Sequence, residues 1–193
     1  MSASTAVALG FSTISECLSS DHNRLDGILA AVCREVEANQ LEEAHKALAE
    51  FVFGISRHIR IEEELLFPLF EMRTGLGGGP TLVMRSEHRE ILAAVRTMRD
   101  GLAQLDTEIF KEGLTFLHQV LPAHNTKEER ILYPTIERVF SNSERALFVE
   151  RLRKELACGS DRVDSDDVPS PTSPTACIVP GPGDCDEREY RGW

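Results

Sequence analysis

One phrase of the sequence occurs twice and constrains the fold more than any other feature. It starts at His58 and again at His124, 66 residues later, and both copies continue with Glu at +4 and +5, Leu at +8, an aromatic residue at +9 and Pro at +10. On an α-helix, residues four apart lie on one face, one turn from each other. A single His-x-x-x-Glu is common by chance, but two extended copies are not. Each copy is therefore expected to point a His and a Glu in the same direction.

The repeat extends beyond this phrase. Ser20-Asp21-His22 corresponds to Ser86-Glu87-His88 at the same offset, and the apolar residues that follow each His recur as well. Within each half the two His are 36 residues apart. The chain is therefore interpreted as two copies of a helical hairpin. Such a duplication predicts a bundle with a pseudo-two-fold axis, in which each half supplies the same groups.

Apolar residues recur every three or four positions in four long segments, as in helices that bury one face. Each stripe is continuous only when a His is included, so the His occupy positions where core residues belong. Pro68 predicts a kink or a helix end nearby, and the run GLGGGP at 75–80 separates the two halves. A fifth helix is expected to begin at a Ser143 N-cap. The predicted fold is all-α: an up-down-up-down four-helix bundle with a short fifth helix.

The bundle is predicted to occupy residues 12–157. From about Gly159 the apolar pattern is lost, and residues 165–183 are rich in Pro, Ser, Asp and Thr. Such a composition buries too little apolar area to offset the entropy of ordering, so residues 158–193 are predicted to form a disordered Pro/Ser/acidic tail. If the protein has a protein partner, this tail is the expected point of contact.

Charge and composition exclude several classes of function. The formal net charge is −11 and no basic stripe appears, which argues against nucleic acid as a partner. No secretory signal is found in Met1–Gly10, and no apolar run approaches the roughly 20 residues that span a bilayer. The expected location is the cytoplasm, without membrane association. The five Cys contain no CxxC pair, and reduced thiols are expected.

The heights of the four His along the bundle can be compared. If the hairpin turns lie near residues 40 and 106, each His is 18 residues from its turn. In an antiparallel hairpin, equal distances from the turn mean equal levels along the axis. Six groups on core faces should therefore meet in one layer. These predicted metal-binding residues are His22, His58, Glu62, His88, His124 and Glu128.

Burying six titratable groups without partners would be strongly destabilising, whereas a metal centre uses imidazoles and carboxylates as ligands. One tetrahedral zinc takes four ligands, too few for this set. The set suits two metal ions, each with two terminal His, with Glu62 and Glu128 bridging and a shared oxygen and an open position completing each ion. Ferritin-type di-iron sites use four Glu and two His, so the inverse ratio indicates a different family. Mn or Zn would accept the same ligands.

The pattern H…HxxxE…H…HxxxE over roughly residues 12–140 resembles the hemerythrin-like HHE cation-binding family, in its four-His, two-Glu branch. The resemblance implies a four-helix bundle around two non-heme iron ions with an oxo or hydroxo bridge, with the four His as terminal ligands and the two Glu as bridges. Oxygen-carrying hemerythrins have HxxxH on the third helix, but Leu92 follows His88 at +4 here. They also place the last carboxylate at +5 from the fourth-helix His, where this chain has Glu129. The resemblance is closer to the branch that includes iron–sulfur repair proteins.

The leading functional hypothesis is a cytoplasmic di-iron protein that binds or reacts with a small oxidant: O₂, NO or H₂O₂. Because the fifth His is absent, peroxide or NO handling ranks above O₂ carriage. The alternatives are an iron or redox sensor acting through a protein partner, and an iron donor in iron–sulfur cluster repair. A zinc-bound or metal-free bundle is the simplest alternative.

Other polar residues are expected to lie outside the site. Asp26 is one turn from His22, but a surface role is favoured. Glu63 and Glu129 follow the bridging Glu by about 100° of helix, which predicts an exposed face. His45 lies roughly 20 Å along the helix from His58 and cannot reach the layer. A sixth His, His118, is expected on another face.

Overall fold

The computed structural model of the protein describes residues 12–157, which contain helices and no strand. Within this range, no helix combines the length and the apolar character that crossing a membrane requires. The predicted disordered tail, residues 158–193, lies outside the described residues, as do Cys158, Cys177 and Cys185.

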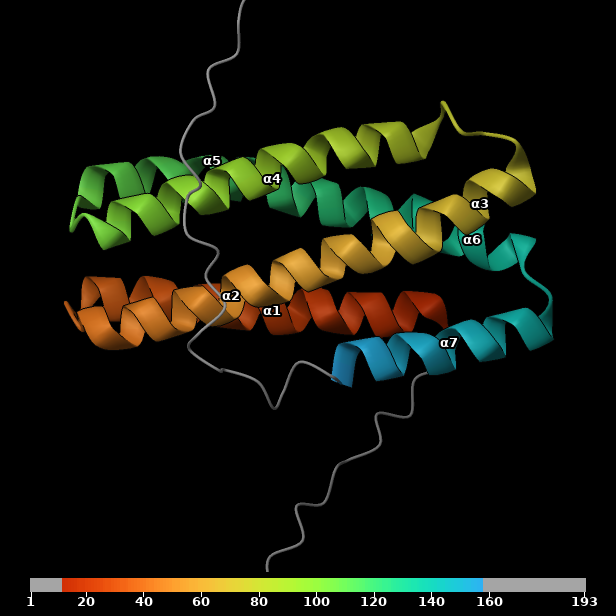
Figure 1. Cartoon of the computed structure of the whole chain (residues 1–193), viewed down its shortest axis with the longest axis horizontal. Helices are drawn as coiled ribbons and strands as arrows, with labels where there is room; N and C mark the ends of the chain where they lie inside the picture. The colour runs from red at the N-terminus through yellow and green to blue at the C-terminus, as the bar shows by residue number, and fades with distance from the viewer. Residues whose placement is uncertain (1–11, 158–193) are drawn as a thin grey trace, which may run out of the picture. The chain divides into compact units, whose positions relative to one another are not determined.

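Four long antiparallel helices form the body of the structure (Figure 1). The first hairpin consists of α1 (Ile14–Glu37) and α2 (Leu41–Ile61), and the second of α4 (Pro80–Ala103) and α5 (Thr107–Lys127). The hairpins contact each other through α2 with α4 and through α1 with α6 (Tyr133–Val139). The predicted all-α bundle is confirmed.

The second helix of each hairpin does not stop at its C-terminal end. It continues through a π-helical turn into a further short helix. The π turn η1 links α2 to α3, and η2 links α5 to α6. The bounds of these elements are Glu62–Leu66 for η1, Phe67–Thr74 for α3 and Glu128–Leu132 for η2.

Each π turn precedes a Pro. Pro68 has no N–H to donate to the carbonyl four residues earlier, and its ring would clash with that carbonyl. The helix adapts by a wider turn, in which the Phe67 N–H donates to the Glu62 carbonyl, five residues back. In the second half the Tyr133 N–H donates to the Glu128 carbonyl in the same way. The irregularity predicted near Pro68 is thus a π turn that begins at the Glu itself.

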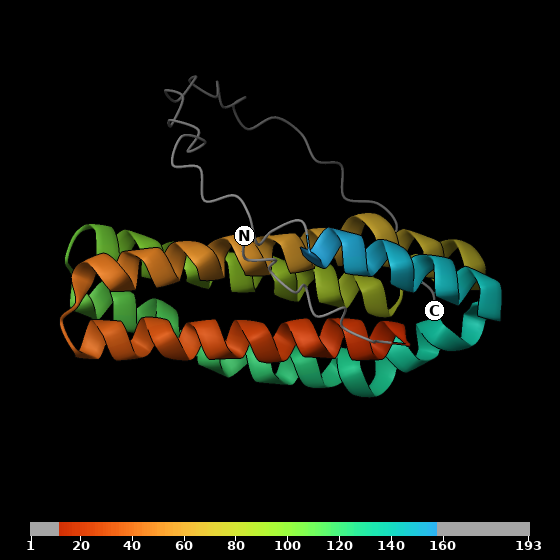
Figure 2. The same cartoon turned by 90° about the horizontal axis from the view of Figure 1, so that it is seen from below.

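The fifth helix, α7 (Asn142–Ala157), packs against α1 and α2 (Figure 2). Ser141 caps its start: the Ser141 Oγ accepts the Glu144 N–H at 3.3 Å, and a Glu144 carboxylate oxygen accepts the Ser141 N–H at 2.9 Å. The predicted Ser143 cap is wrong by two residues, because the Ser-x-x-Glu spacing that closes this reciprocal pair starts at Ser141.

Two apolar clusters fill the bundle, one between the four His and the hairpin turns and the other beyond the His. The first includes Leu25, Phe51, Ile91 and Leu117, and the second includes Leu18, Phe67, Phe70 and Leu152. The layer of His and Glu lies between them. It is a polar layer with apolar packing above and below it.

The two hairpin turns show the duplication in the backbone. Asn39 has φ 56° and Leu105 has φ 55°, and these residues are 66 positions apart. The left-handed conformation is tolerated by Asn but costs other L residues about 1–2 kcal/mol. Leu105 is also 64% exposed, so its side chain gains little from packing.

We expect Leu105→Asn to raise the free energy of unfolding by about 1 kcal/mol, because it relieves this backbone strain. The reciprocal Asn39→Leu should lower it by a similar amount. Urea unfolding followed by circular dichroism measures both. Equal midpoints for both variants and the wild type would contradict the strain at Leu105.

Candidate metal centre

The structure brings the six predicted residues together in the middle of the bundle. None is more than 4% exposed. Each of the four long helices contributes one His, and each of the two π turns begins with one Glu. The site therefore lies where the two hairpins meet. Its members are His22 from α1, His58 from α2, Glu62 from η1, His88 from α4, His124 from α5 and Glu128 from η2.

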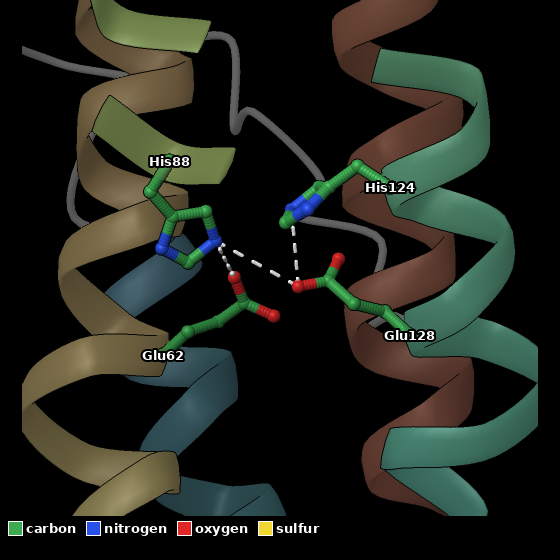
Figure 3. Close-up of side chains that lie close together, drawn as sticks. All are labelled: Glu62, His88, His124 and Glu128. Carbon is green, nitrogen blue, oxygen red and sulfur yellow. Dashed lines mark ion pairs between the residues drawn. The ribbon is translucent and has the colours of Figure 1, made fainter. Parts of the chain in front are cut away.

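The two carboxylates reach across the interface between the hairpins. Glu62 places Oε2 3.2 Å from the Nε2 of His88, and Glu128 places Oε1 3.1 Å from the Nε2 of His124 (Figure 3). The other oxygen of Glu128 lies 3.4 Å from the Nε2 of His22 in the first hairpin. The Nε2 atoms of His22 and His58 are 3.0 Å apart. Inward-facing nitrogens and oxygens thus come from both hairpins.

Some of these buried atoms have no hydrogen-bond partner in the described part of the chain. They are Glu62 Oε2, His88 Nε2 and Glu128 Oε1, which meet one another and His124 Nε2 as ion pairs at 3.1–3.7 Å without forming a hydrogen bond. Together with His124, these residues offer four ligand atoms within 4.8 Å of one another, and His22, His58 and Glu128 offer another three. An unpartnered buried polar atom costs about 1–3 kcal/mol. A cation removes this cost by accepting the lone pairs, so the donor set fits a metal.

Two further carboxylates hold His residues of the opposite hairpin. Glu63 Oε1 lies 2.8 Å from His88 Nδ1, and Glu129 Oε1 lies 2.8 Å from His22 Nδ1. The prediction of an exposed face for Glu63 and Glu129 is wrong, because the wider π turn brings the residue after the inner Glu toward the neighbouring hairpin. Their side chains remain 34% and 38% exposed, at the edge of the site.

The remaining two His are held from within their own hairpins. Asp21 Oδ2 lies 3.0 Å from His58 Nδ1, and Glu87 Oε2 lies 3.0 Å from His124 Nδ1. Every one of the four His thus gives its Nδ1 to a carboxylate, which leaves Nε2 directed at the centre and fixes the ring orientation. Sequence reasoning missed Asp21 and Glu87, although both precede a site His in the repeated Ser-Asp/Glu-His.

Asp21 also connects the site to the fifth helix. Its Oδ1 accepts from Arg24 Nε at 2.8 Å and from Arg57 Nη2 at 3.3 Å. Arg57 in turn donates to the carbonyl of Leu156 near the end of α7 at 2.8 Å. Burial by itself would raise the pKa of Asp21, but its bonds to His58 and Arg24 lower that pKa to about 2.

Tyr133 is the other site residue that sequence reasoning missed. It is fully buried, and its hydroxyl donates to Glu62 Oε1 at 2.6 Å and contacts Glu128 Oε2 at 3.1 Å. Burial first, and then the charges of Glu128 and Glu62, raise the pKa of Tyr133 well above its ordinary value. The phenol therefore keeps its proton. The signal in the sequence was the aromatic position of the repeated phrase, which holds Phe67 in the first copy.

When no metal is bound, protonated His side chains neutralise the negative charge of the carboxylates. Burial lowers the pKa of a His, but the bonds to Glu128 and Glu129 outweigh it and raise the pKa of His22 to about 9. The pKa of His88 rises to about 10, against its burial, through Glu128 and Glu62. Burial by itself would raise the pKa of Glu128, but His124 first, and then His22 and His88, hold that pKa well below its ordinary value. The metal-free site is thus a set of buried ion pairs.

Three other residues expected to lie outside the site do so. Asp26 is exposed, and it is Glu129, not Asp26, that holds His22. His45 and His118 are also exposed.

These pKa values make the stability of the metal-free protein depend on pH. Because the folded pKa of His22 and His88 exceeds the unfolded value of about 6.5, their stabilisation is present below pH 6.5 and lost as pH rises through 9–10. We expect the free energy of unfolding in chelator to fall by roughly 3 kcal/mol for each of these two His between pH 6.5 and pH 10. Urea unfolding at stepped pH measures it. His88→Gln should flatten the profile, and His118→Gln should leave it unchanged; a flat wild-type profile would contradict the ion pairs.

The outer carboxylates also give a prediction for metal affinity. Glu63→Ala should weaken zinc binding by about 10- to 100-fold, because His88 loses the group that orients it. Glu64→Ala is the matched control, since its side chain is 63% exposed and within residues 12–157 pairs only with Arg60, at 3.9 Å. Calorimetric titration of the metal-free variants with Zn²⁺ measures both. Equal affinities in the two variants would show that Glu63 does not orient His88.

Comparison with known proteins agrees with this geometry. Residues 13–136 match the family model of the hemerythrin HHE cation binding domain, a span that contains the four site His and both inner Glu. Searches of curated proteins and of solved structures found no significant match. Since the family match covers more than half of the chain, this protein belongs to the hemerythrin HHE cation-binding domain family.

Proposed function

We propose that the protein holds a non-heme di-iron centre that binds or reacts with a small oxidant, namely O₂, NO or H₂O₂. His22 and His58 would hold one ion, and His88 and His124 the other. The observation that carries the proposal is the group of buried atoms Glu62 Oε2, His88 Nε2 and Glu128 Oε1, which face one another within 3.7 Å but form no hydrogen bond within residues 12–157.

The orientation of the two inner carboxylates supports two ions. Glu62 directs Oε2 at His88, while its Oε1 lies 3.7 Å from the Nε2 of His58. Glu128 directs Oε1 at His124, while its Oε2 faces His22. Each carboxylate therefore presents one oxygen to each pair of His, as a bridge between two ions requires. A single ion between four His would leave half of these oxygens unused.

Iron is the proposed metal because imidazole and carboxylate ligands suit it and because the family is one of cation-binding, typically iron-binding, domains. When bound, a pair of iron ions supplies electrons and open coordination positions to a small oxidant.

The chain itself orients the ligands and excludes water. The outer carboxylates turn each Nε2 inward, and the apolar clusters on both sides of the layer bury it. Phe67 stacks on the ring of His88 with 5.8 Å between centroids. Tyr133 keeps a proton within reach of Glu62. Leu92, at the position of the fifth His of oxygen-carrying hemerythrins, packs on the apolar cluster. Peroxide or NO handling therefore ranks above O₂ carriage in the proposal.

Metal analysis and rapid kinetics test the proposal together. We expect protein purified without added metal to contain about two irons per chain, and the iron-loaded protein to change its absorption in stopped-flow mixing with at least one of the three oxidants. Glu62→Ala and Glu128→Ala should each reduce the iron content, because either change removes a bridge.

The exposed His118→Ala is the control and should retain the iron of the wild type. Zinc in place of iron, or no spectral response and no turnover with any of the three oxidants, would overturn the proposal.

A further inference from the structure

The centre of the site departs from the two-fold symmetry of the bundle. Phe67 and Tyr133 occupy the same position of the repeat, 66 residues apart. Each places its ring against a site His: Phe67 lies 5.8 Å from His88, and Tyr133 lies 6.0 Å from His22, between ring centroids. The two rings are thus equivalent in place and differ by one hydroxyl.

That hydroxyl lies among the ligand atoms of the His22–His58 half. It is 2.6 Å from Glu62 Oε1, 3.1 Å from Glu128 Oε2, 3.3 Å from His22 Nε2 and 3.5 Å from His58 Nε2. The phenol donates its single proton to Glu62 Oε1, and its oxygen also lies against Glu128 Oε2; these are the two carboxylate oxygens that face this half. A metal ion that enters here must take these oxygens from Tyr133.

The other half has no such competitor. Its aromatic residue is Phe67, which has no hydroxyl, and the buried atoms that form no hydrogen bond within residues 12–157, Glu62 Oε2, His88 Nε2 and Glu128 Oε1, all belong to it. Four ligand atoms from Glu62, His88, His124 and Glu128 lie within 4.8 Å of one another. This half is ready to accept an ion without breaking a hydrogen bond to a phenol.

We propose that the two metal positions are filled in order, the His88–His124 position first, because the Tyr133 hydroxyl donates to Glu62 Oε1 and lies against Glu128 Oε2 at the His22–His58 position. The inference rests on the two-metal centre of the proposed function. Tyr133 acts as a positioning residue that distinguishes two sites whose inner His and Glu are related by the repeat. A hydrogen bond to a charged group corresponds to roughly a 10- to 100-fold difference in affinity, which sets the expected separation of the two steps.

Calorimetric titration of the metal-free protein with Zn²⁺ tests the order without reference to activity. The wild type should bind two equivalents in two steps separated by at least about tenfold. Tyr133→Phe should tighten the second step by about tenfold or more and leave the first unchanged. The double variant Phe67→Tyr with Tyr133→Phe moves the hydroxyl to the other half and should restore two separated steps.

Substitution of repeat-related His residues identifies which position fills first. His58→Asn should leave one equivalent bound at wild-type affinity, whereas His124→Asn should abolish the tight step. Circular dichroism verifies that each variant is folded. If either is not, crystals of the wild type grown with one equivalent of Zn²⁺ should show anomalous scattering between His88 and His124.

The outcomes separate the two proposals. Binding of fewer than two equivalents by the wild type would overturn the two-metal centre itself. Two indistinguishable steps that Tyr133→Phe does not alter would overturn only the order. A weaker second step in Tyr133→Phe would show that the hydroxyl is a ligand and not a competitor, and anomalous scattering between His22 and His58 at one equivalent would reverse the order.

Discussion

The structure depends on how a layer of charge is buried across the middle of an apolar bundle. Four His and two Glu, none more than 4% exposed, lie between two apolar clusters. Unpaired charges in such a place would cost several kcal/mol each. Without a metal, protonated His pair with the carboxylates, as the raised pKa of His22 and His88 indicates. With a metal, the same atoms become ligands. Both arrangements draw on the same carboxylates, so proton binding and metal binding compete for one site.

The two π turns connect this layer to the backbone. A Pro in a helix leaves one backbone carbonyl without its usual N–H donor. In each half of the repeat, a π turn that begins at the inner Glu precedes the Pro. The wider turn lets two consecutive carboxylates serve the site. Glu62 points into the centre, while Glu63 holds His88 from the outside. One local backbone irregularity therefore supplies both an inner ligand and an outer support.

Symmetry explains most of the site, and its departures mark where the halves differ in chemistry. The outer carboxylates obey the repeat, since Asp21 corresponds to Glu87 and Glu63 to Glu129. Their surroundings do not. Asp21 is buried, paired with arginines and linked through Arg57 to α7, whereas Glu87 pairs with Lys127. At the centre, a phenol faces one pair of His and a phenyl ring faces the other.

The sequence by itself determined the helices and the six inner residues, because helical periodicity and the repeat at 66 depend only on spacing. Where the apolar stripe of a helix is continuous only if a His is included, that His must lie on the buried face of the helix. The roles of Glu63, Asp21 and Tyr133 were decided by tertiary structure. Spacing along a regular helix directs Glu63 away from the site, and only the π turn and the neighbouring hairpin bring it to His88. Likewise, Phe67 and Tyr133 occupy the same position of the repeat. The role of the Tyr133 hydroxyl becomes visible only in the folded structure, where it contacts carboxylates from both hairpins. Such contacts depend on how helices distant in sequence pack.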